Sequence, residues 1–415
     1  MSIQPVRGTK DLLPAEARKF RHISDWARAV TELFGYAEMA TPIFEFSEVF
    51  KKGLGESTDI IGKEMYSFLD RGGDELSLRP EGTAGVVRAF ISEGLAQNLP
   101  LKVFYQGPMF RYERPQKGRQ RQFHQIGVEC LGIDSPQADS ECIAMAQMLL
   151  QKLGIDSKCQ LEINSIGDRS SRARYRQALV DFFSQHEKSL SEDSQKRLHT
   201  NPMRILDSKH KADQALVAEA PLLSDYLSPE AKDFFEQVTL QLKALGLKPQ
   251  LNPRLVRGLD YYCHTVFEFK TSELGAQDAV LSGGRYDGLV EMMGGPATAG
   301  VGWAAGMERL ALLLDQEIPA PRPQVIIPLG NTPEIELEAL KLAHLLREQG
   351  FVVESTYSGN LQKRLKRANR LKARAALLLG PEEVQKSQVT VKDLDTGEQK
   401  TLAQQDLAQA LKDFA

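Results

Sequence analysis

Residues 103–132 predict two long strands joined by an arginine-rich loop, in the order VFYQGPMFRYERPQKGRQRQFHQIGVECLG. Because alternate side chains of a strand share a face, one row should carry two cations, an aromatic ring, an amide and a carboxylate, namely Arg119, Arg121, Phe123, Gln125 and Glu129. Such a row could bind a polyphosphate at one end, stack a base in the middle and hold a polar ring or an amino group at the other. An exposed hairpin with solvated charges is the alternative.

The bulk properties exclude several classes of protein. A chain of 415 residues is too long for one ordinary core, so two or three domains are expected. Its 52 Lys and Arg stand against 55 Asp and Glu, so any nucleic-acid binding must come from local patches. The four cysteines are too scattered for a disulfide framework or a metal site. No signal segment or membrane span is recognisable, which predicts a cytoplasmic protein.

The pattern of strands and helices changes three times along the chain. Residues 1–167 predict helices and mainly antiparallel strands, 168–247 an inserted helical domain, and 248–318 a return of the strand-rich pattern, so the first and third segments should share one sheet. The proline-rich IPAPRP predicts a stiff linker, and 323–415 then predicts a compact α/β domain with a largely parallel sheet. The expected fold class is α+β, with a separate α/β domain at the C-terminal end.

Polar residues mark three further positions where a ligand could bind. Arg111 ends the first strand of the hairpin, where it could meet a phosphate with two parallel N–H donors; a structural ion pair with Glu113 or Glu129 is the alternative. The sequence RPEGT, 79–83, places polar residues at a predicted helix start, where backbone N–H groups are free. The glycine-rich turn SGGRYDG, 282–288, could close against a ligand but is weak evidence alone.

Two more clusters combine glycine with charged and aromatic residues. In RGLDYY, residues 257–262, a strand would direct Tyr261 and Tyr262 to opposite faces, so at most one should reach a given ligand. The glycine spacing of GVGWAAGMER, 300–309, does not fit a dinucleotide-binding motif. We expect instead a strand whose glycines let a flat ligand lie against the backbone, followed by a helix whose first turns present Glu308 and Arg309.

Residues 360–374 hold seven Lys and Arg and no acidic residue. Helical spacing gathers four of them into a basic stripe that could grip a phosphate backbone, Lys363, Arg367, Arg370 and Arg374. A solvated outer face is the alternative. The histidines lack metal spacing, and no Ser-His-Asp or Cys-His order suggests a covalent nucleophile, so no metal site built from protein side chains is expected.

Taken together, these segments resemble the histidyl-tRNA synthetases, a family of class II aminoacyl-tRNA synthetases, over essentially the whole chain. FRYERPQKGRQRQFHQIGVE is similar to the second motif of the class and GVGWAAGMERL to the third. The region around TPIFEFSEVF resembles the first motif, which forms the dimer interface in this class. LVRGLDYY and GGRYDG resemble the two signatures of the histidine enzymes.

The resemblance implies an activity, substrates and residue roles. L-Histidine would be activated by ATP with Mg²⁺ to histidyl-adenylate and pyrophosphate, then transferred to the 3′ end of tRNA(His) by a cytoplasmic homodimer with an anticodon-binding C-terminal domain. ATP would be bound by Arg111, Glu113, Arg119, Phe123 and Arg309, and histidine by Glu81, Thr83, Gln125, Glu129, Tyr261, Tyr262 and Tyr286. Arg257 would be the catalytic cation, with Arg111 on the α-phosphate, and Gln116 would approach the acceptor end of the tRNA.

Two other functions stay open at this point. A catalytically idle relative, such as the synthetase-like regulatory subunit of ATP phosphoribosyltransferase, would bind histidine as an effector, but such relatives typically lack the C-terminal domain and parts of the motifs. A synthetase of the same class for another amino acid is disfavoured by RGLDYY together with GGRYDG.

Overall fold

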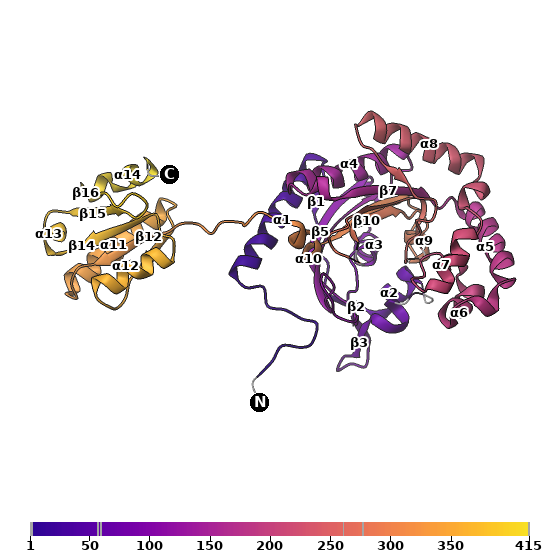
Figure 1. Ribbon diagram of the computed structural model, residues 1–415, viewed down its shortest axis with the longest axis horizontal. Coiled ribbons are helices and arrows are strands. Elements are labelled where there is room, and N and C mark those ends of the chain that lie inside the picture. Colours follow the sequence, from indigo (N-terminus) through magenta and orange to yellow (C-terminus); the bar gives the residue numbers. More distant parts are fainter. Residues whose placement is uncertain (1–2, 56–57, 59, 260, 276–277, 414–415) are drawn as a thin grey trace. The chain divides into compact units, whose positions relative to one another are not determined.

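The computed structural model describes residues 3–413 except 56–57, 59, 260 and 276–277, and the chain forms two compact units, 1–318 and 319–415. Each unit has its own sheet (Figure 1). No helix of the described ranges is long and apolar enough to cross a membrane.

An eight-stranded, mainly antiparallel sheet forms the centre of the first unit (Figure 1). The strands in spatial order are β1 (Ala37–Glu38), β5 (Leu101–Phe110), β6 (Gln122–Leu131), β11 (Gly300–Gly306), β10 (Ala279–Arg285), β9 (Cys263–Lys270), β7 (Gln160–Ser165) and β8 (Gln250–Leu251). The pairs β1–β5 and β7–β8, at the two edges, are parallel. Because β11 pairs with β6, and β9 with β7, strands from before and after residues 168–247 belong to one sheet, as predicted.

Helices pack an apolar core against one face of this sheet. They are α1 (Pro14–Leu33), α4 (Pro136–Lys152), α8 (Pro229–Ala244) and α10 (Met307–Leu313). In α1, Ile23, Ala27 and Val30 follow the helical period and are buried in that core. The Trp303 indole N–H donates to the Cys142 carbonyl of α4 at 3.1 Å, which joins β11 to the helix layer.

A small antiparallel sheet and short helices lie beside the main sheet. The sheet has the order β2 (Phe44–Phe46), β4 (Glu75–Leu78), β3 (Tyr66–Leu69). Its neighbours in the chain are α2 (Ser47–Leu54), the π-helical turn η1 (Ile60–Glu64) and α3 (Thr83–Ser92). These elements share a second apolar core, to which α9 (Leu289–Met292) also contributes. The turn at 70–74 connects β3 to β4.

Four helices follow β7 in the chain and precede β8, with α8 last. The first three are α5 (Arg169–Ser184), α6 (Glu192–Thr200) and α7 (Lys211–Glu219), with the 3₁₀ turns η5 (Pro202–Ile205) and η6 (Leu223–Tyr226) between or after them. Side chains of Asp168, Ser191 and Ser228 accept backbone N–H groups at the starts of α5, α6 and α8. Buried residues of α5, α6 and α7 share a core with α2, α3 and α9, whereas those of α8 belong to the helix core of the main sheet.

The second unit contains a five-stranded sheet between helices. Its strand order is β13 (Val353–Ser355), β12 (Gln324–Pro328), β14 (Ala375–Leu379), β15 (Gln388–Asp393) and β16 (Gln399–Ala403), and its helices are α11 (Pro333–Glu348), α12 (Leu361–Arg370), α13 (Pro381–Gln385) and α14 (Leu407–Asp413). Two strand pairs are parallel and two antiparallel, so the prediction of a largely parallel sheet is wrong. The sequence of β16, QKTLA, escaped prediction because its first three residues are exposed and polar.

Candidate active site

A cavity of about 400 Å³ opens on the face of the main sheet opposite the helix core. The alternation of β6 creates it, because Ile126, Val128 and Cys130 enter the core while Gln125 and Glu129 line the cavity. The lining includes every residue that the resemblance assigns to ATP or histidine, namely Glu81, Thr83, Arg111, Glu113, Arg119, Phe123, Gln125, Glu129, Arg257, Tyr261, Tyr262, Tyr286 and Arg309. Its volume is typical of a small-molecule site.

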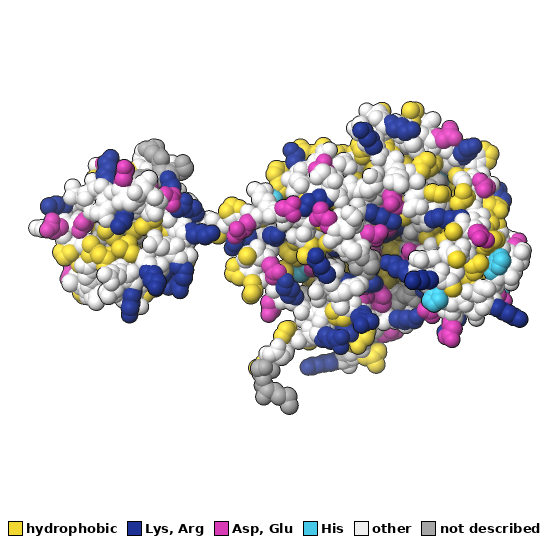
Figure 2. Space-filling model, viewed as in Figure 1, with side chains coloured by type: hydrophobic (Ala, Val, Ile, Leu, Met, Phe, Trp, Pro, Cys, Tyr) yellow, Lys and Arg dark blue, Asp and Glu magenta, His cyan; other side chains and the backbone are white. Residues whose placement is uncertain are grey.

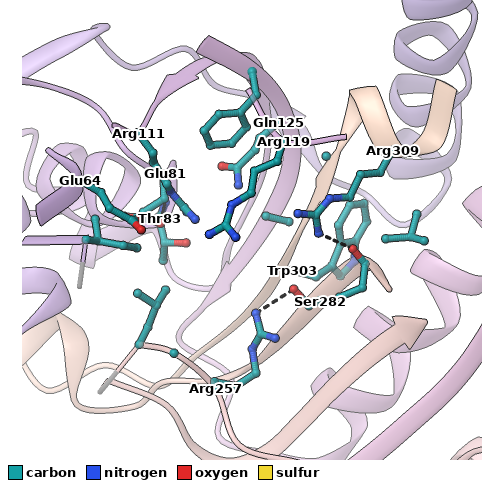
Figure 3. A pocket seen from close by; sticks show the side chains of 18 of the residues that line it. Glu64, Glu81, Thr83, Arg111, Arg119, Gln125, Arg257, Ser282, Trp303 and Arg309 are labelled. Carbon is teal, nitrogen blue, oxygen red and sulfur yellow. Dashed lines mark hydrogen bonds between the residues drawn. The ribbon is translucent and has the colours of Figure 1, made fainter. Parts of the chain in front are cut away.

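Five arginines line this cavity, and the four to which the resemblance assigns roles come from three distant parts of the chain. Figure 3 shows Arg111 and Arg119 on the β5–β6 side, Arg257 opposite them and Arg309 on α10. Burial lowers the pKa of Arg309, and the positive charges of Arg119 and Arg111 lower it further. Cations that depress one another's pKa in a partly buried space form a site suited to a polyanion such as a triphosphate.

Protein carbonyls and one carboxylate hold the arginines of the hairpin and of α10. Arg111 donates through Nε to the Pro80 carbonyl at 2.8 Å, and its guanidinium lies 5.4 Å from the centre of the Phe123 ring. Arg119 pairs with Glu113. Arg309 donates to the Gly118 carbonyl at 3.2 Å and to the Ala279 carbonyl at 2.6 Å, so α10 is tied to the β5–β6 loop.

Arg257 is held by two residues, of which Glu268 was not singled out in the sequence and Ser282 begins the SGGRYDG segment. Its Nη1 pairs with Glu268 of β9, and its Nη2 donates to the Ser282 hydroxyl of β10 at 2.7 Å. Burial acts to lower the pKa of Arg257, but the negative charge of Glu268 raises it overall. The sequence does hold an indication of this contact. Glu268 interrupts the mainly apolar strand CHTVFEFK, and a buried glutamate at such a position needs a cationic partner.

The other end of the cavity carries a hydrogen-bonded carboxylate. Glu129 accepts the Thr83 hydroxyl at 2.8 Å on one oxygen and the Tyr286 hydroxyl on the other. Burial raises the pKa of Glu129 to about 8, although both hydroxyl donors act to lower it. A buried carboxyl with a pKa in this range can accept a polar N–H of a ligand once it has lost its proton.

Glu81 caps the start of α3 at this end of the cavity. Its carboxylate accepts the backbone N–H of Thr83 at 2.7 Å and that of Ala84 at 2.8 Å. Despite these bonds, burial raises the pKa of Glu81. The residue therefore has a structural role at the helix start in addition to facing the cavity.

Two predictions about individual side chains are wrong, and the reason in both is where a strand begins. Arg121 does not join the row of the cavity, because β6 begins at Gln122; its guanidinium lies 3.8 Å from the centre of the Tyr112 ring and donates to the Glu113 carbonyl. Tyr261 and Tyr262 both line the cavity, with ring centres 4.6 Å apart. They precede β9, which begins at Cys263, so strand alternation does not separate them.

Two glycines of β11 make room for protein side chains of the cavity. A Cβ atom at Gly300 would overlap the Tyr286 ring, and one at Gly302 would overlap the Glu129 carboxylate. Gly306 also lines the cavity and has only ordinary contacts around it, so the prediction that a flat ligand lies against this strand stays a prediction. The strand and the helix expected around them, β11 and α10, are present.

The residues predicted to contact tRNA lie outside this lining. Gln116 is exposed in the β5–β6 loop, where its backbone pairs with that of Arg119. Lys363, Arg367 and Arg370 are exposed on α12 of the second unit. Asp260, within RGLDYY, is outside the described residues. The lining also contains three charged residues that the sequence analysis did not select, Glu64, Arg204 and Asp207, the last two from the segment between β7 and β8.

Comparison with known proteins decides the family. The model of the histidyl-tRNA synthetase family matches residues 8–310. The chain belongs to the histidyl-tRNA synthetase family. A model of the anticodon-binding domain matches residues 324–414. The resemblance found in the sequence is thus confirmed, as is the α+β fold with a mostly antiparallel sheet and a C-terminal α/β anticodon-binding domain.

Members of the histidyl-tRNA synthetase family match over nearly the full chain. The histidine–tRNA ligase of Rhodospirillum rubrum is 58% identical over 402 residues, which are 97% of this chain and 96% of that protein. The apo histidyl-tRNA synthetase of S. aureus has 35% identity and a TM-score of 0.83, covering 99% of this chain and 100% of that one. A Bacillus halodurans protein titled an ATP phosphoribosyltransferase regulatory subunit/histidyl-tRNA synthetase shares the fold, with 23% identity, a TM-score of 0.67 and coverage of 92% and 99%.

Proposed function

We propose that this chain is a cytoplasmic histidine–tRNA ligase, which activates L-histidine with ATP and transfers it to the 3′ end of tRNA(His). The observation that carries the proposal is a cavity with arginines at one end and the Glu129 carboxylate at the other. The first end suits a triphosphate and the second a ring N–H. Family membership supports the same assignment.

The chemistry asks the protein for position and charge. The histidine carboxylate attacks the α-phosphorus, the bond to the β-phosphate oxygen breaks, and pyrophosphate leaves, so no protein nucleophile is needed. Arg111 and Arg257 would stabilise the charge that grows on the α-phosphate, and Arg119 and Arg309 would meet the outer phosphates. Phe123 offers a ring for the adenine, with Glu113 nearby. A ribose hydroxyl of the tRNA then attacks the adenylate carbonyl, and AMP leaves.

Histidine would bind at the carboxylate end of the cavity. Glu129 and Gln125 are placed to contact the imidazole nitrogens, while Glu81, Thr83, Tyr261, Tyr262 and Tyr286 complete the walls. A site that hydrogen-bonds a polar ring rejects apolar analogues by roughly 10⁴-fold or more, because those analogues leave buried polar groups unpaired. No editing reaction is needed for such a site.

We expect Mg²⁺ to enter as part of the MgATP substrate. Among the residues that the structure describes, no three Asp, Glu, His or Cys side chains could hold a metal ion together. Mg²⁺ is bound in sites of this kind by one or two carboxylates, waters and the substrate phosphates. Glu308 lines the cavity beside Arg309, so it is the carboxylate that would hold the ion beside the outer phosphates. There the ion would neutralise phosphate charge.

The regulatory-subunit alternative fits this chain less well. The likeness of this chain to the Bacillus halodurans structure, at 23% identity, concerns the fold alone. All four arginines expected for ATP face the cavity here, and the described residues of the C-terminal α/β unit form five strands and four helices. An effector-binding protein would not require this cluster of arginines.

The tRNA would contact both units. In the second unit, Figure 2 shows Lys and Arg side chains gathered on the side where Figure 1 places α12. The exposed Lys363, Arg367 and Arg370 of that helix suit a phosphate backbone, and the match to an anticodon-binding domain supports tRNA as the partner of this unit. In the first unit, the exposed Gln116 would approach the acceptor end of the tRNA.

The small sheet supports a homodimer. Phe44, Phe46 and Phe68 are about half exposed on β2 and β3, at 56%, 58% and 45% of their surface, and Leu69 beside them is 70% exposed. Phe46 and Phe68 both pair with Leu76 of β4, so their side chains lie in one row across the sheet. An apolar face of this kind is typical of a surface that a second subunit covers.

We predict that the double variant Phe46→Glu and Phe68→Glu weakens dimerisation by about tenfold or more, because two charges would be buried at the interface. Analytical ultracentrifugation of the wild type and the variant over a range of concentrations measures this. Leu240→Glu, at a residue 62% exposed on α8, is the matched control and should leave the dimer intact. A monomeric wild type, or a variant that dimerises as tightly as the wild type, would contradict the prediction.

Glu81→Ala should raise the KM for histidine far more than the KM for ATP. It should also lower the free energy of unfolding by about 1 kcal/mol, because the two backbone N–H groups of α3 lose their acceptor. ATP–pyrophosphate exchange and thermal unfolding give the two readouts. Equal effects on both KM values would place the residue away from the histidine site.

The decisive experiment for the proposed function is ATP–pyrophosphate exchange with each of the twenty amino acids in turn, followed by aminoacylation of tRNA(His). We expect exchange with histidine alone and transfer of histidine to the tRNA. Absence of exchange with every amino acid would favour the effector-binding alternative, and exchange with another amino acid would reassign the specificity.

A further inference from the structure

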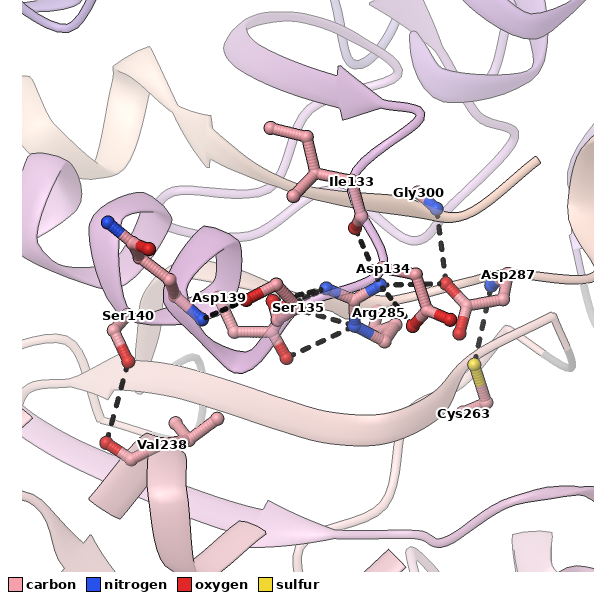
Figure 4. Close-up of polar contacts among 11 residues, drawn as sticks. Ile133, Asp134, Ser135, Asp139, Ser140, Val238, Cys263, Arg285, Asp287 and Gly300 are labelled. Carbon is pink, nitrogen blue, oxygen red and sulfur yellow. Dashed lines mark hydrogen bonds and ion pairs between the residues drawn. The ribbon is translucent and has the colours of Figure 1, made fainter. Parts of the chain in front are cut away.

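We propose that Arg285 is a positioning residue for the histidine site, and that its ion pairs with Asp139 and Asp287 hold Tyr286 against Glu129. The inference rests on the proposed function and extends it to residues that do not line the cavity. Arg285 ends β10, and Tyr286 follows it directly. Figure 4 shows the contacts around the guanidinium.

All five N–H donors of Arg285 have protein acceptors. Nε donates to Asp139 of α4 at 3.0 Å, and Nη2 donates to the same carboxylate at 2.7 Å and to the Ser135 carbonyl at 3.0 Å. Nη1 donates to the Ile133 carbonyl at 3.1 Å and to Asp287 at 3.0 Å. A planar fork with every donor satisfied fixes both the position and the rotation of the side chain.

The ion pair between Arg285 and Asp139 is more deeply buried than ordinary surface ion pairs. The side chains of Arg285 and Asp139 are both fully buried, and the guanidinium lies 5.1 Å from the centre of the Phe234 ring of α8. Removing either partner would leave an uncompensated charge in the protein interior. The pair therefore locks the end of β10 to α4 and to the loop before it.

Asp287 connects this pair to the backbone around Tyr286. One oxygen of Asp287 accepts both Arg285 Nη1 and the backbone N–H of Gly300 at 3.1 Å, while the Tyr286 N–H donates to the Gly300 carbonyl at 2.7 Å. The residues directly before and after Tyr286, which are Arg285 and Asp287, thus both have fixed side chains. Its ring lies against Gly300, where a Cβ atom would overlap it.

These contacts of Arg285 and Asp287 determine where the Tyr286 hydroxyl lies. That hydroxyl donates to one oxygen of Glu129, and the Thr83 hydroxyl donates to the other. If the backbone at 285–287 shifts, Tyr286 loses its place and the Glu129 carboxylate loses one of its two side-chain donors. Histidine binding should suffer. The arginines that meet the phosphates lie on other elements, and the two that contact β10 do so at Ala279 and Ser282, before the end that Arg285 holds, so they should keep their positions.

The test compares two KM values in ATP–pyrophosphate exchange. Asp287→Ala removes the acceptor shared by Arg285 and Gly300, and we expect the KM for histidine to rise about tenfold or more while the KM for ATP changes by less than about threefold. Asp287→Asn keeps an acceptor oxygen and should restore most of the affinity. Arg285→Lys keeps the charge beside Asp139 but loses the fork, and it should show the same preferential effect on histidine.

Asp134→Ala is the matched control. Asp134 lies 4.0 Å from Arg285, but its side chain is 83% exposed, so its loss should leave both KM values unchanged. Variants that lower the thermal stability while leaving the histidine KM unchanged, or that raise both KM values equally, would overturn the inference. A wild type without histidine-dependent exchange would instead refute the proposed function, so the two failures are distinguishable.

Discussion

Arg257→Ala is expected to slow adenylate formation by about 10²-fold or more, as the loss of a preorganised charge donor does at other phosphoryl and acyl centres. Glu268 and Ser282 hold the guanidinium in place before the substrates arrive, so the wild-type site needs little reorganisation at the reacting phosphate. Rapid-quench measurement of the first turnover, with saturating histidine and ATP, isolates this step from product release.

The controls for this variant separate charge from geometry. Arg257→Lys keeps a positive charge without the planar fork and should recover only part of the rate. Arg28→Ala removes an arginine that pairs with Glu38 on the surface of the same unit and should have no effect on the first turnover. Adenylation by Arg257→Ala at nearly the wild-type rate would refute the catalytic role.

Glu129→Gln should raise the KM for histidine by about 10²-fold, because a charged acceptor of a ring N–H is replaced by a neutral amide. The KM for ATP should change little, since the phosphates would meet arginines on other elements. Exchange assays with either substrate varied provide the measurement. A variant with normal histidine affinity would show that the imidazole does not bind at this carboxylate.

The raised pKa of Glu129, about 8, adds a pH dependence to this prediction. Below that pH the carboxyl of the free enzyme holds a proton, so the wild-type KM for histidine should fall as the pH rises towards 8. In Glu129→Gln, the KM for histidine should not show this fall between neutral pH and pH 8. The folded state also binds this proton more tightly than an unfolded glutamate, whose pKa is 4.5, so the free energy of unfolding contributed by this group decreases between pH 4.5 and 8.

Local periodicity in the sequence predicts the framework of the site. The long pair β5–β6, the glycine-containing β11 and the start of α10 follow from alternation and from helix-start patterns. The same alternation is enough to place Gln125 and Glu129 on the face opposite Ile126 and Val128. These features depend on residues close together in the chain, so a single sequence is enough to predict them.

The contacts that orient the site depend on distant residues, and the sequence does not reveal them. Arg285 meets Asp139 across 146 positions, and Glu308 accepts the backbone N–H of His124 across 184. The error over Tyr261 and Tyr262 arose because alternation was applied outside a strand. GGRYDG was predicted to be a turn, but Gly283–Arg285 belong to β10 and the turn follows them, and only packing shows that the arginine is buried.

The most direct test of the account is a crystal structure of the protein with a non-reactive histidyl-adenylate analogue. We predict that the imidazole contacts Glu129 and Gln125, that the group replacing the α-phosphate lies between Arg111 and Arg257, and that the adenine stacks on Phe123. An analogue bound with its imidazole at the arginine end, or bound outside the cavity, would contradict the account.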